Sequence, residues 1–291
     1  MPVHAETVGT KLTPVQAQMT PRRMLAFAAG LQDTSPVLLD DLHPDFCVAP
    51  QICVALEWQS MVQNNLGALV GASPDEHPKA VHAIQDSTFI RPVRAGETLT
   101  THGEVTGLWS GRSGTNMAVQ FYTYDGSEAL VYTSYVQSTY RGVALIGDSQ
   151  EPDRRPIVPA PSDRMQPPIS IEIDIPRTLP HTFSECADIW NPIHTERATA
   201  KTAGLPDIIL HGVATWALAG RDIVAACAAQ DITRLRRLRG RLAGMVIPGK
   251  PLQLTLQAHA DGDTLHVLYA IKTQDGAPAI RDGYACLDLS R

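Results

Sequence analysis

The sequence predicts an α+β protein of two similar halves, in each of which antiparallel strands wrap around one long buried helix. Three observations support this. Each half has a long, mostly apolar helical stretch, each has strands with alternating apolar residues after it, and landmarks recur at a nearly constant distance along the chain. A helix and a sheet each have an apolar side to bury, and packing one against the other buries both. The expected fold class is therefore α+β.

The central helices are expected within residues 51–70 and 209–229. In the second stretch apolar and small residues recur every three or four positions, which is the spacing of a helix. These residues are Ile209, Val213, Trp216, Ala217, Gly220, Ile223, Val224 and Cys227. A helix that is apolar on most of its sides belongs in the interior of a domain.

Strands are indicated by alternation with a period of two. Leu252, Leu254 and Leu256 alternate with polar residues, and the stretches 265–271 and 117–121 follow the same pattern. Asp125-Gly126 and Asp275-Gly276 lie between such runs, and Asp-Gly favours the tight turn of a β-hairpin. The strands of each half are therefore expected to be antiparallel.

Four landmark pairs indicate an internal duplication. Similar residues recur at offsets of 156, 158, 153 and 150 positions, in the pairs Pro36/Pro192, Trp58/Trp216, Gly96/Gly249 and Gly126/Gly276. A constant offset is the signature of repeated units. Six prolines between Pro152 and Pro168 favour an extended linker. We therefore expect a first domain at 1–145, a linker at 146–170 and a second domain at 171–291.

Composition excludes several classes of function. The chain has 291 residues and a formal charge of −6, which argues against nucleic acid or an acidic membrane surface as the main partner. Its five cysteines lack the C-x-x-C spacing of a metal or redox site. The chain shows no signal peptide, no long apolar run and no glycine-rich nucleotide loop. These features predict a cytoplasmic protein with no metal and no dinucleotide cofactor.

The stretch "ADIWNPIHTERATA" at 187–200 gathers residues that could carry chemistry. Asn191-Pro192 favours a turn, because proline fixes its own φ and restricts the residue before it. His194 follows in that turn, and Asp188 is the acid that could serve as its partner. A neutral imidazole at cytoplasmic pH suits a general base.

The motifs "WNPIHTE" (190–196), "LHGVAT" (210–215) and "IPGKPLQL" (247–254) resemble the MaoC-like, R-specific enoyl-CoA hydratases, or hydratase 2 family. The resemblance implies a double hotdog, in which one chain forms the pseudo-dimer of two antiparallel sheets, each wrapped around a central helix. It also implies a lyase that adds or removes water across the 2,3-double bond of an enoyl-CoA thioester. It implies no cofactor other than the coenzyme A that is part of the substrate.

The family's functional motif is G-D-x-N-P-x-H, followed by His-Gly at the start of the central helix. Asn191, Pro192 and His194 match the first part, and His211-Gly212 match the second. The family's aspartate position falls on Ile189 when no gap is allowed, and the acid here is Asp188, one residue earlier. Whether Asp188 replaces the family's aspartate is left open by the sequence.

The first half keeps less of the motif. "LQDTSPVLL" retains Asp33 and Pro36, but Ser35 stands at the asparagine position and Leu38 at the histidine position. This half is expected to be a degenerate copy that serves packing and shapes a tunnel for the acyl chain.

The resemblance assigns a role to each candidate residue. His194, Asp188 and Asn191 would form the catalytic set, and the Gly212 N–H at a helix start would stabilise the enolate oxygen. His211 and Trp190 would contact the substrate. Arginine binds phosphate well, so the basic run 234–241 offers contacts for coenzyme A through Arg236, Arg237 and Arg239.

Simpler interpretations of these residues stay open. Asp188 could be a solvated loop acid, Trp190 could belong to the core, and the basic run could be a solvated surface. Two other functions also stay open, namely a hotdog thioesterase and a non-catalytic partner subunit that binds acyl thioesters. The acyl chain and the direction of the reaction cannot be inferred, and assembly into a homodimer of pseudo-dimeric chains is expected.

Overall fold

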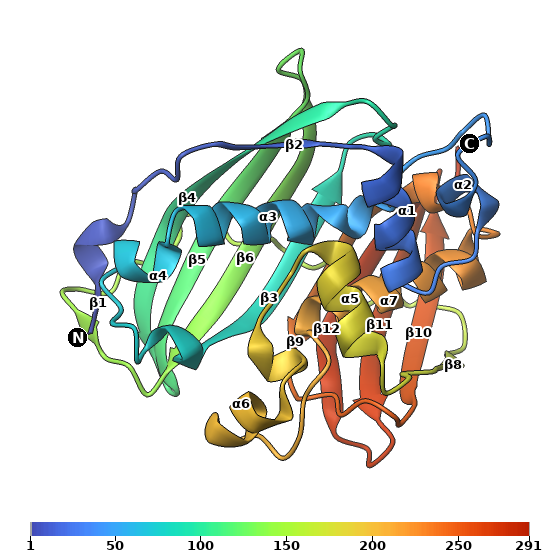
Figure 1. The fold of residues 1–291 in the computed structure, drawn as a ribbon. Helices are drawn as coiled ribbons and strands as arrows, with labels where there is room; N and C mark the ends of the chain where they lie inside the picture. Colours follow the sequence, from blue (N-terminus) through green and yellow to red (C-terminus); the bar gives the residue numbers. More distant parts are fainter. Residues whose placement is uncertain (1, 291) are drawn as a thin grey trace.

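The computed structural model describes residues 2–290 and contains one ten-stranded antiparallel sheet that runs through the whole molecule (Figure 1). Its strand order is β2-β4-β5-β6-β3-β9-β12-β11-β10-β8. The strands are β2 (Val15–Gln18), β3 (Ala80–Phe89), β4 (Thr98–Gly111), β5 (Gly114–Tyr124), β6 (Leu130–Arg141), β8 (Ile169–Ile173), β9 (Leu235–Leu242), β10 (Leu252–Asp261), β11 (Thr264–Thr273) and β12 (Pro278–Asp288). A separate parallel pair joins β1 (Val3–His4) to β7 (Leu145–Ile146).

The two halves meet where β3 pairs with β9. Residues 84–88 of β3 face residues 237–241 of β9 in an antiparallel register. This pairing joins the sheet of the first half to the sheet of the second, edge to edge. The pseudo-dimer is therefore formed by pairing of two sheet edges, and the unpaired edges that would invite association with other chains are removed at this junction.

The helices lie on one face of this sheet, in front of it in Figure 1. The two central helices are α3 (Cys53–Gln63) and α7 (Gly212–Cys227), and the shorter ones are α1 (Pro21–Gly30), α2 (Pro36–Leu39), α4 (Leu66–Leu69), α5 (Leu179–Ala187) and α6 (Arg197–Thr202). The second central helix matches its prediction. The first ends early, because Asn65 adopts a left-handed conformation with φ of 49° and separates α3 from α4.

The main core is shared by both halves. Trp216 of α7 and Phe27 of α1 are fully buried in it, together with the inward-facing residues of the sheet. Helices α1 and α5 pack against each other, with the rings of Phe27 and Phe183 6.3 Å apart. Gly30 makes this contact possible, since a Cβ there would lie 2.9 Å from the Cβ of Cys186.

The duplication is visible in the backbone conformation. Gly96 and Gly249 both have φ of +90°, and their N–H groups donate to Met19 and Ile175, which follow the edge strands β2 and β8. Pro36 starts α2, just as Pro192 starts a short 3₁₀ helix of residues 192–194. The repeat therefore preserves turns as well as residue types.

The two central tryptophans are not equivalent, although the sequence pairs them. Val48 donates to the carbonyl of Val93 and Leu210 donates to that of Val246, and these bonds anchor the starts of α3 and α7. They set an offset of 162 residues for the helices, which aligns Trp58 with a glycine of α7 rather than with Trp216. The offset of 158 residues between Trp58 and Trp216 is therefore a coincidence.

The proline-rich connection between the halves lies between β7 and β8. Residues 147–168 form no helix or strand apart from an isolated bridge at Gln150. The carbonyl of Ile157 within this stretch accepts a hydrogen bond from Arg237 of β9. Among residues 2–290, no helix is both long enough and apolar enough to span a membrane.

Candidate active site

The candidate site is built on the turn that follows α5. The helix ends at Ala187, and Asp188 then adopts a left-handed conformation with φ of 55° while its N–H donates to Ser184. Asn191 begins the next turn by accepting the N–H of Ile193 with its side chain. Proline then starts the 3₁₀ helix that ends at His194, so this local sequence positions the imidazole.

His194 is held in one tautomer by the backbone. Its Nδ1 lies 2.8 Å from the carbonyl oxygen of Ile209, and because a carbonyl only accepts, Nδ1 carries the proton. Nε2 is therefore the unprotonated nitrogen. Burial lowers the pKa of His194 to about 4, and the bond to Ile209 offsets this only in part. The imidazole is therefore neutral near pH 7 and can accept a proton at Nε2.

His211 lies directly against His194. The two rings are stacked with centroids 3.7 Å apart and an interplanar angle of 27°. His211 is buried, and its Nε2 lies 3.2 Å from the carbonyl of Ile189 and 3.1 Å from the hydroxyl of Ser184. Burial holds the pKa of His211 well below its usual range, and the neighbouring His194 lowers it further. The pair is therefore two neutral imidazoles.

Gly212 is the first residue of α7 and follows His211 directly. The N–H groups of a first helical turn have no partner within the helix, and the helix dipole makes this end favourable for negative charge. The glycine also leaves space, since a Cβ would lie 2.6 Å from the side chain of Leu242. A helix start that favours negative charge therefore lies directly after His211.

Asp188 has a different partner from the one expected. Its carboxylate accepts a hydrogen bond of 2.7 Å from Gln59 of α3, and the charge of Arg23 on α1 lies close enough to act on it. Asp188 itself is exposed, and none of its hydrogen bonds or ion pairs involves His194. The side chain of Ile189 is buried in the main core, so this position brings no acid to the histidines either.

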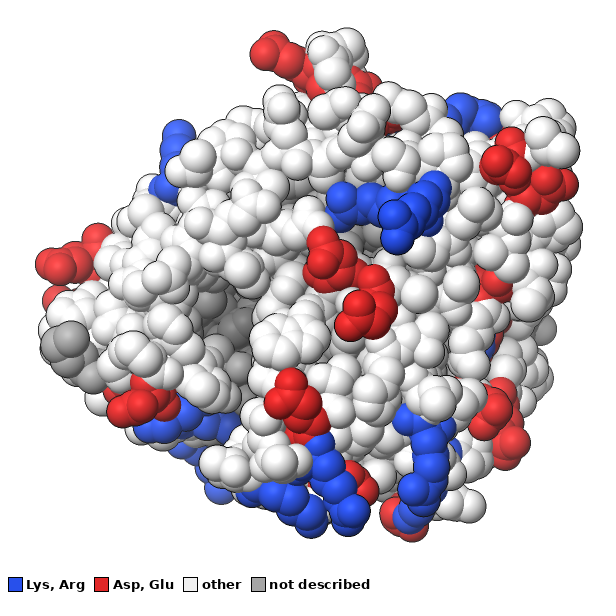
Figure 2. Space-filling view, in the orientation of Figure 1, with Lys and Arg blue, Asp and Glu red and all other residues white. Residues whose placement is uncertain are grey.

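The remaining residues of the turn are placed as follows. Trp190 is 56% exposed and so does not belong to the core. Asn191 uses its side-chain oxygen to cap the turn. Figure 2 shows a hollow on this face, below α3 and beside the segment that joins α5 to α6. The turn that carries His194 is part of that segment, so a ligand in the hollow would lie next to it.

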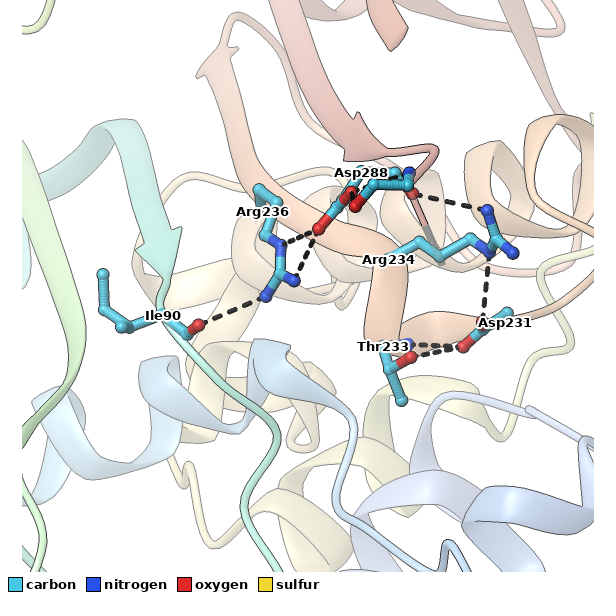
Figure 3. Close-up of polar contacts among 7 residues, drawn as sticks. Ile90, Asp231, Thr233, Arg234, Arg236 and Asp288 are labelled. Carbon is cyan, nitrogen blue, oxygen red and sulfur yellow. Dashed lines mark hydrogen bonds and ion pairs between the residues drawn. The ribbon is translucent and has the colours of Figure 1, made fainter. Parts of the chain in front are cut away.

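The arginines of the basic run lie on β9 and are paired. Arg236 donates to the carboxylate of Asp288 and to the carbonyl of Ile90 (Figure 3). Arg237 forms two bonds of 2.8 Å with Asp86 of β3, and Arg239 lies 3.4 Å from the same carboxylate. These contacts hold β9 in the sheet. A contact of these arginines with coenzyme A stays a prediction.

Sequence reasoning missed three residues that hold the site together. Ser184 contacts His211, the carbonyl of Ile209 orients His194, and Gln59 holds Asp188. A serine and a glutamine in helices are ordinary residues, and a backbone carbonyl has no sequence signature. Only the packing of α5 and α3 around the turn reveals them.

The first half lacks the corresponding group. Leu38 occupies the second position after Pro36, as His194 does after Pro192, and it is fully buried. Gln32 has φ of 54°, which matches Asp188, and its carbonyl accepts from Arg221 of α7. The backbone of the turn is thus repeated in the first half without the imidazole.

Comparisons with known proteins agree with this architecture. Residues 181–273 match the MaoC like domain, and residues 6–127 match the FAS1-like dehydratase domain region. The mouse peroxisomal multifunctional enzyme type 2 is 24% identical over 89% of this chain, and the matched part is 35% of that enzyme. A probable enoyl-CoA hydratase 2 of Dictyostelium discoideum is 21% identical over 97% of this chain and 96% of its own length. This chain therefore spans about a third of the mouse enzyme and nearly all of the Dictyostelium one.

Solved structures share the fold. A MaoC-like dehydratase from Phytophthora capsici superposes with a TM-score of 0.82 at 20% identity, over 98% of both chains. A Mycobacterium tuberculosis protein with a double hotdog fold superposes with a TM-score of 0.63 at 14% identity, over 97% of both chains. With one sheet shared by two helix-wrapping halves and a histidine turn before the second central helix, the chain has the double hotdog fold of the MaoC-like dehydratases, with a MaoC like domain at residues 181–273 and a FAS1-like dehydratase region at residues 6–127.

Proposed function

We propose that this protein adds water to, or removes it from, the 2,3-double bond of an enoyl-CoA thioester, at a single site in its second half. The observation that carries the proposal is the position of His194, with Nδ1 bound to the carbonyl of Ile209 and Nε2 free to accept a proton. Gly212, the residue after His211, begins α7 and presents its N–H at the start of the helix. The reaction uses a base, whose conjugate acid can protonate the α-carbon, and an oxyanion donor.

The reaction in the direction of hydration proceeds in two parts. His194 takes a proton from water at Nε2 while the water oxygen bonds to the β-carbon, and the electron pair of the double bond moves onto the thioester oxygen. The N–H of Gly212 stabilises the enolate oxygen that forms. The imidazolium of His194 then returns the proton to the α-carbon, so no cofactor is needed beyond the coenzyme A of the substrate.

The names of similar proteins support the substrate class. The Dictyostelium protein is a probable enoyl-CoA hydratase 2, and a relative in Mycobacterium tuberculosis is the enoyl-CoA hydratase ChsH3, which is 24% identical over 69% of this chain. We infer a coenzyme A thioester as the substrate, with Trp190 at the edge of the site and Asn191 holding the turn. The cytoplasmic location and a dimer of these chains stay predictions from the sequence.

Replacement of His194 tests the proposal directly. We expect His194→Ala to keep the fold and to lose about 10²–10⁴-fold in kcat, which is the usual contribution of a general acid–base group. The measurement is the disappearance of the conjugated double bond in a panel of short, medium, branched and cyclic enoyl-CoA substrates. His102→Ala, at an exposed position on β4, is the matched control and should retain full activity. Equal turnover by the wild type and His194→Ala would refute the assignment.

A binding function is the second candidate, favoured by the absence of a carboxylate among the contacts of His194 and His211. A partner subunit would bind acyl-CoA without converting it. Calorimetry with a saturated acyl-CoA, combined with the turnover assay, separates the two functions. Tight binding with no turnover on any substrate of the panel would favour the binding function.

A further inference from the structure

Among residues 2–290, no carboxylate forms a hydrogen bond with His194 or His211. Asp188 is held by Gln59, and the Ile189 side chain lies in the core, so neither provides a carboxylate beside His194. One base alone holds a water molecule by a single hydrogen bond and leaves its orientation free. A second acceptor is needed to fix the water in line with the β-carbon.

We propose that His211 is this second acceptor, so that two stacked imidazoles hold the reacting water in this protein. The proposal rests on the hydratase function described above. In it, His211 accepts one hydrogen of the water at Nδ1, while His194 accepts the other at Nε2. His211 is then a catalytic residue, and Ser184 is a positioning residue that acts through it.

The hydrogen bonds of His211 decide which nitrogen is available. The carbonyl of Ile189 only accepts, so the bond of 3.2 Å places the proton on Nε2, where the hydroxyl of Ser184 shares it at 3.1 Å. Nδ1 therefore keeps its lone pair. It is buried and has no hydrogen-bond partner among the described residues 2–290. A buried acceptor with no partner is costly, which indicates that a water or a substrate group satisfies it.

The position of His211 suits this role. Its ring is in contact with that of His194 at a centroid separation of 3.7 Å, and it directly precedes the oxyanion donor Gly212. Both rings are kept neutral, because burial lowers the pKa of each. A protonated Nδ1 could not accept a hydrogen bond, so burial preserves the acceptor.

The proton balance of the step is unchanged by this assignment. One water proton moves to Nε2 of His194, the hydroxyl adds to the β-carbon, and the same proton returns to the α-carbon. His211 neither gains nor loses a proton, and its bond at Nδ1 passes from the water to the new hydroxyl group. The step needs no oxidant, reductant or further reactant.

Two substitutions of His211 separate the catalytic role from a structural one. Asparagine places its side-chain amide near the position of Nδ1, whereas glutamine reaches the position of Nε2. If Nδ1 holds the water, His211→Asn should keep a measurable part of kcat. In that case His211→Gln and His211→Phe should each lose about 10²-fold or more, with KM changed less than threefold.

Ser184→Ala is the matched control, because it removes a partner of Nε2 and leaves Nδ1 in place. We expect it to lose less than 10-fold in kcat. Thermal unfolding of each variant shows whether the fold is kept. The double variant His194→Ala/His211→Phe should be little worse than His194→Ala alone, since groups that act on one water are not additive.

The outcomes distinguish this inference from the function on which it rests. Two results with an active wild type would overturn the role of Nδ1 and leave the hydratase in place. In the first, all variants of His211 keep full activity. In the second, His211→Gln is active and His211→Asn is inactive. If all three variants of His211 lose both activity and fold, the activity of Ser184→Ala decides. A loss of kcat in Ser184→Ala as large as theirs would assign His211 a structural role. A wild type inactive on every substrate would remove both proposals.

Discussion

His194 is the residue that we propose as the base, and its properties come from three features of its surroundings. The Ile209 carbonyl fixes its tautomer, the His211 ring covers one of its faces, and the surrounding protein removes water from it. A surface histidine has a pKa near 6.5 and would be partly charged at neutral pH. Burial makes the neutral form dominant, so His194 is ready to accept a proton throughout the physiological range.

The pH dependence of activity follows from this shift. The active form of the free enzyme has a neutral His194, and its pKa is lowered to about 4. We expect kcat/KM for hydration to stay constant as pH falls from 7 to about 5 and to decline near pH 4. A profile whose acid limb has a midpoint between 6 and 7 would contradict a buried, neutral base.

Stability must be measured in the same buffers, because the same shift destabilises the fold in acid. The unfolded chain binds a proton at His194 below about pH 6.5, whereas the folded chain does so only near 4. The free energy of unfolding therefore falls as pH falls from 6.5 to 4. Assays started from neutral stock solutions and followed for short times keep loss of fold apart from loss of the base.

At the scale of elements, the contact between α1 and α5 positions the turn of the site. A left-handed residue follows each helix, Gln32 two residues after the end of α1 and Asp188 directly after the end of α5. Each of these residues is then held by a central helix of the other half, through Arg221 and Gln59 respectively. The turn is therefore placed by elements from both halves.

A substitution at Gly30 tests this helix contact. Glycine to alanine within an exposed helix usually stabilises by about 1 kcal/mol. Here the new Cβ would lie 2.9 Å from the Cβ of Cys186, so we expect Gly30→Ala to destabilise by about 1–3 kcal/mol. Chemical denaturation measures the change. Adding Cys186→Gly should recover part of the loss, and a stabilised single variant would show that the helices do not pack this closely.

A substitution at Asp188 decides between the sequence-based pairing and the contact seen in the structure. Asparagine tolerates a left-handed conformation and can still bond to Gln59. From the contact with Gln59 we expect Asp188→Asn to change kcat less than threefold. A loss close to that of His194→Ala would instead support Asp188 as the acid partner of the histidine.

At the scale of the whole molecule, the two halves form one structural unit. The β3–β9 pairing continues the sheet, and the buried carboxylate of Asp86 joins the strands by binding Arg237 and Arg239. A buried charge of this kind is tolerated because it is paired on both sides. The arrangement ties the degenerate half to the half that carries the site.

We expect one functional site per chain. The first half repeats the turn but has Leu38 at the histidine position, and this leucine is fully buried. Calorimetric titration with a non-reactive acyl-CoA analogue should therefore give a stoichiometry of one. His194→Ala should bind with the same stoichiometry, since the base is not needed for binding. Two equivalent sites per chain would contradict a degenerate first half.

The sequence by itself determined the α+β class, a central helix within residues 209–229 and the alternating strands, and its motifs gave the resemblance to the MaoC-like hydratases. The class and the elements could be predicted because helical spacing, strand alternation and Asn-Pro or Asp-Gly turns are local properties of the chain. The duplication could also be recognised from the sequence, since Gly96 and Gly249 both require a positive φ that glycine adopts freely. The coincidence at Trp58 and Trp216 shows the limit of reading repeats from residue types alone.

The tertiary structure decided which of the candidate residues meet. Asp188 and His194 are six residues apart, but one left-handed residue at the end of α5 directs the carboxylate towards Gln59 of the other half. His211 lies seventeen residues after His194, yet its ring stacks on it because the turn after α5 folds against the start of α7. Side-chain direction at a turn depends on one backbone angle and on packing between distant elements, and neither is encoded in local spacing.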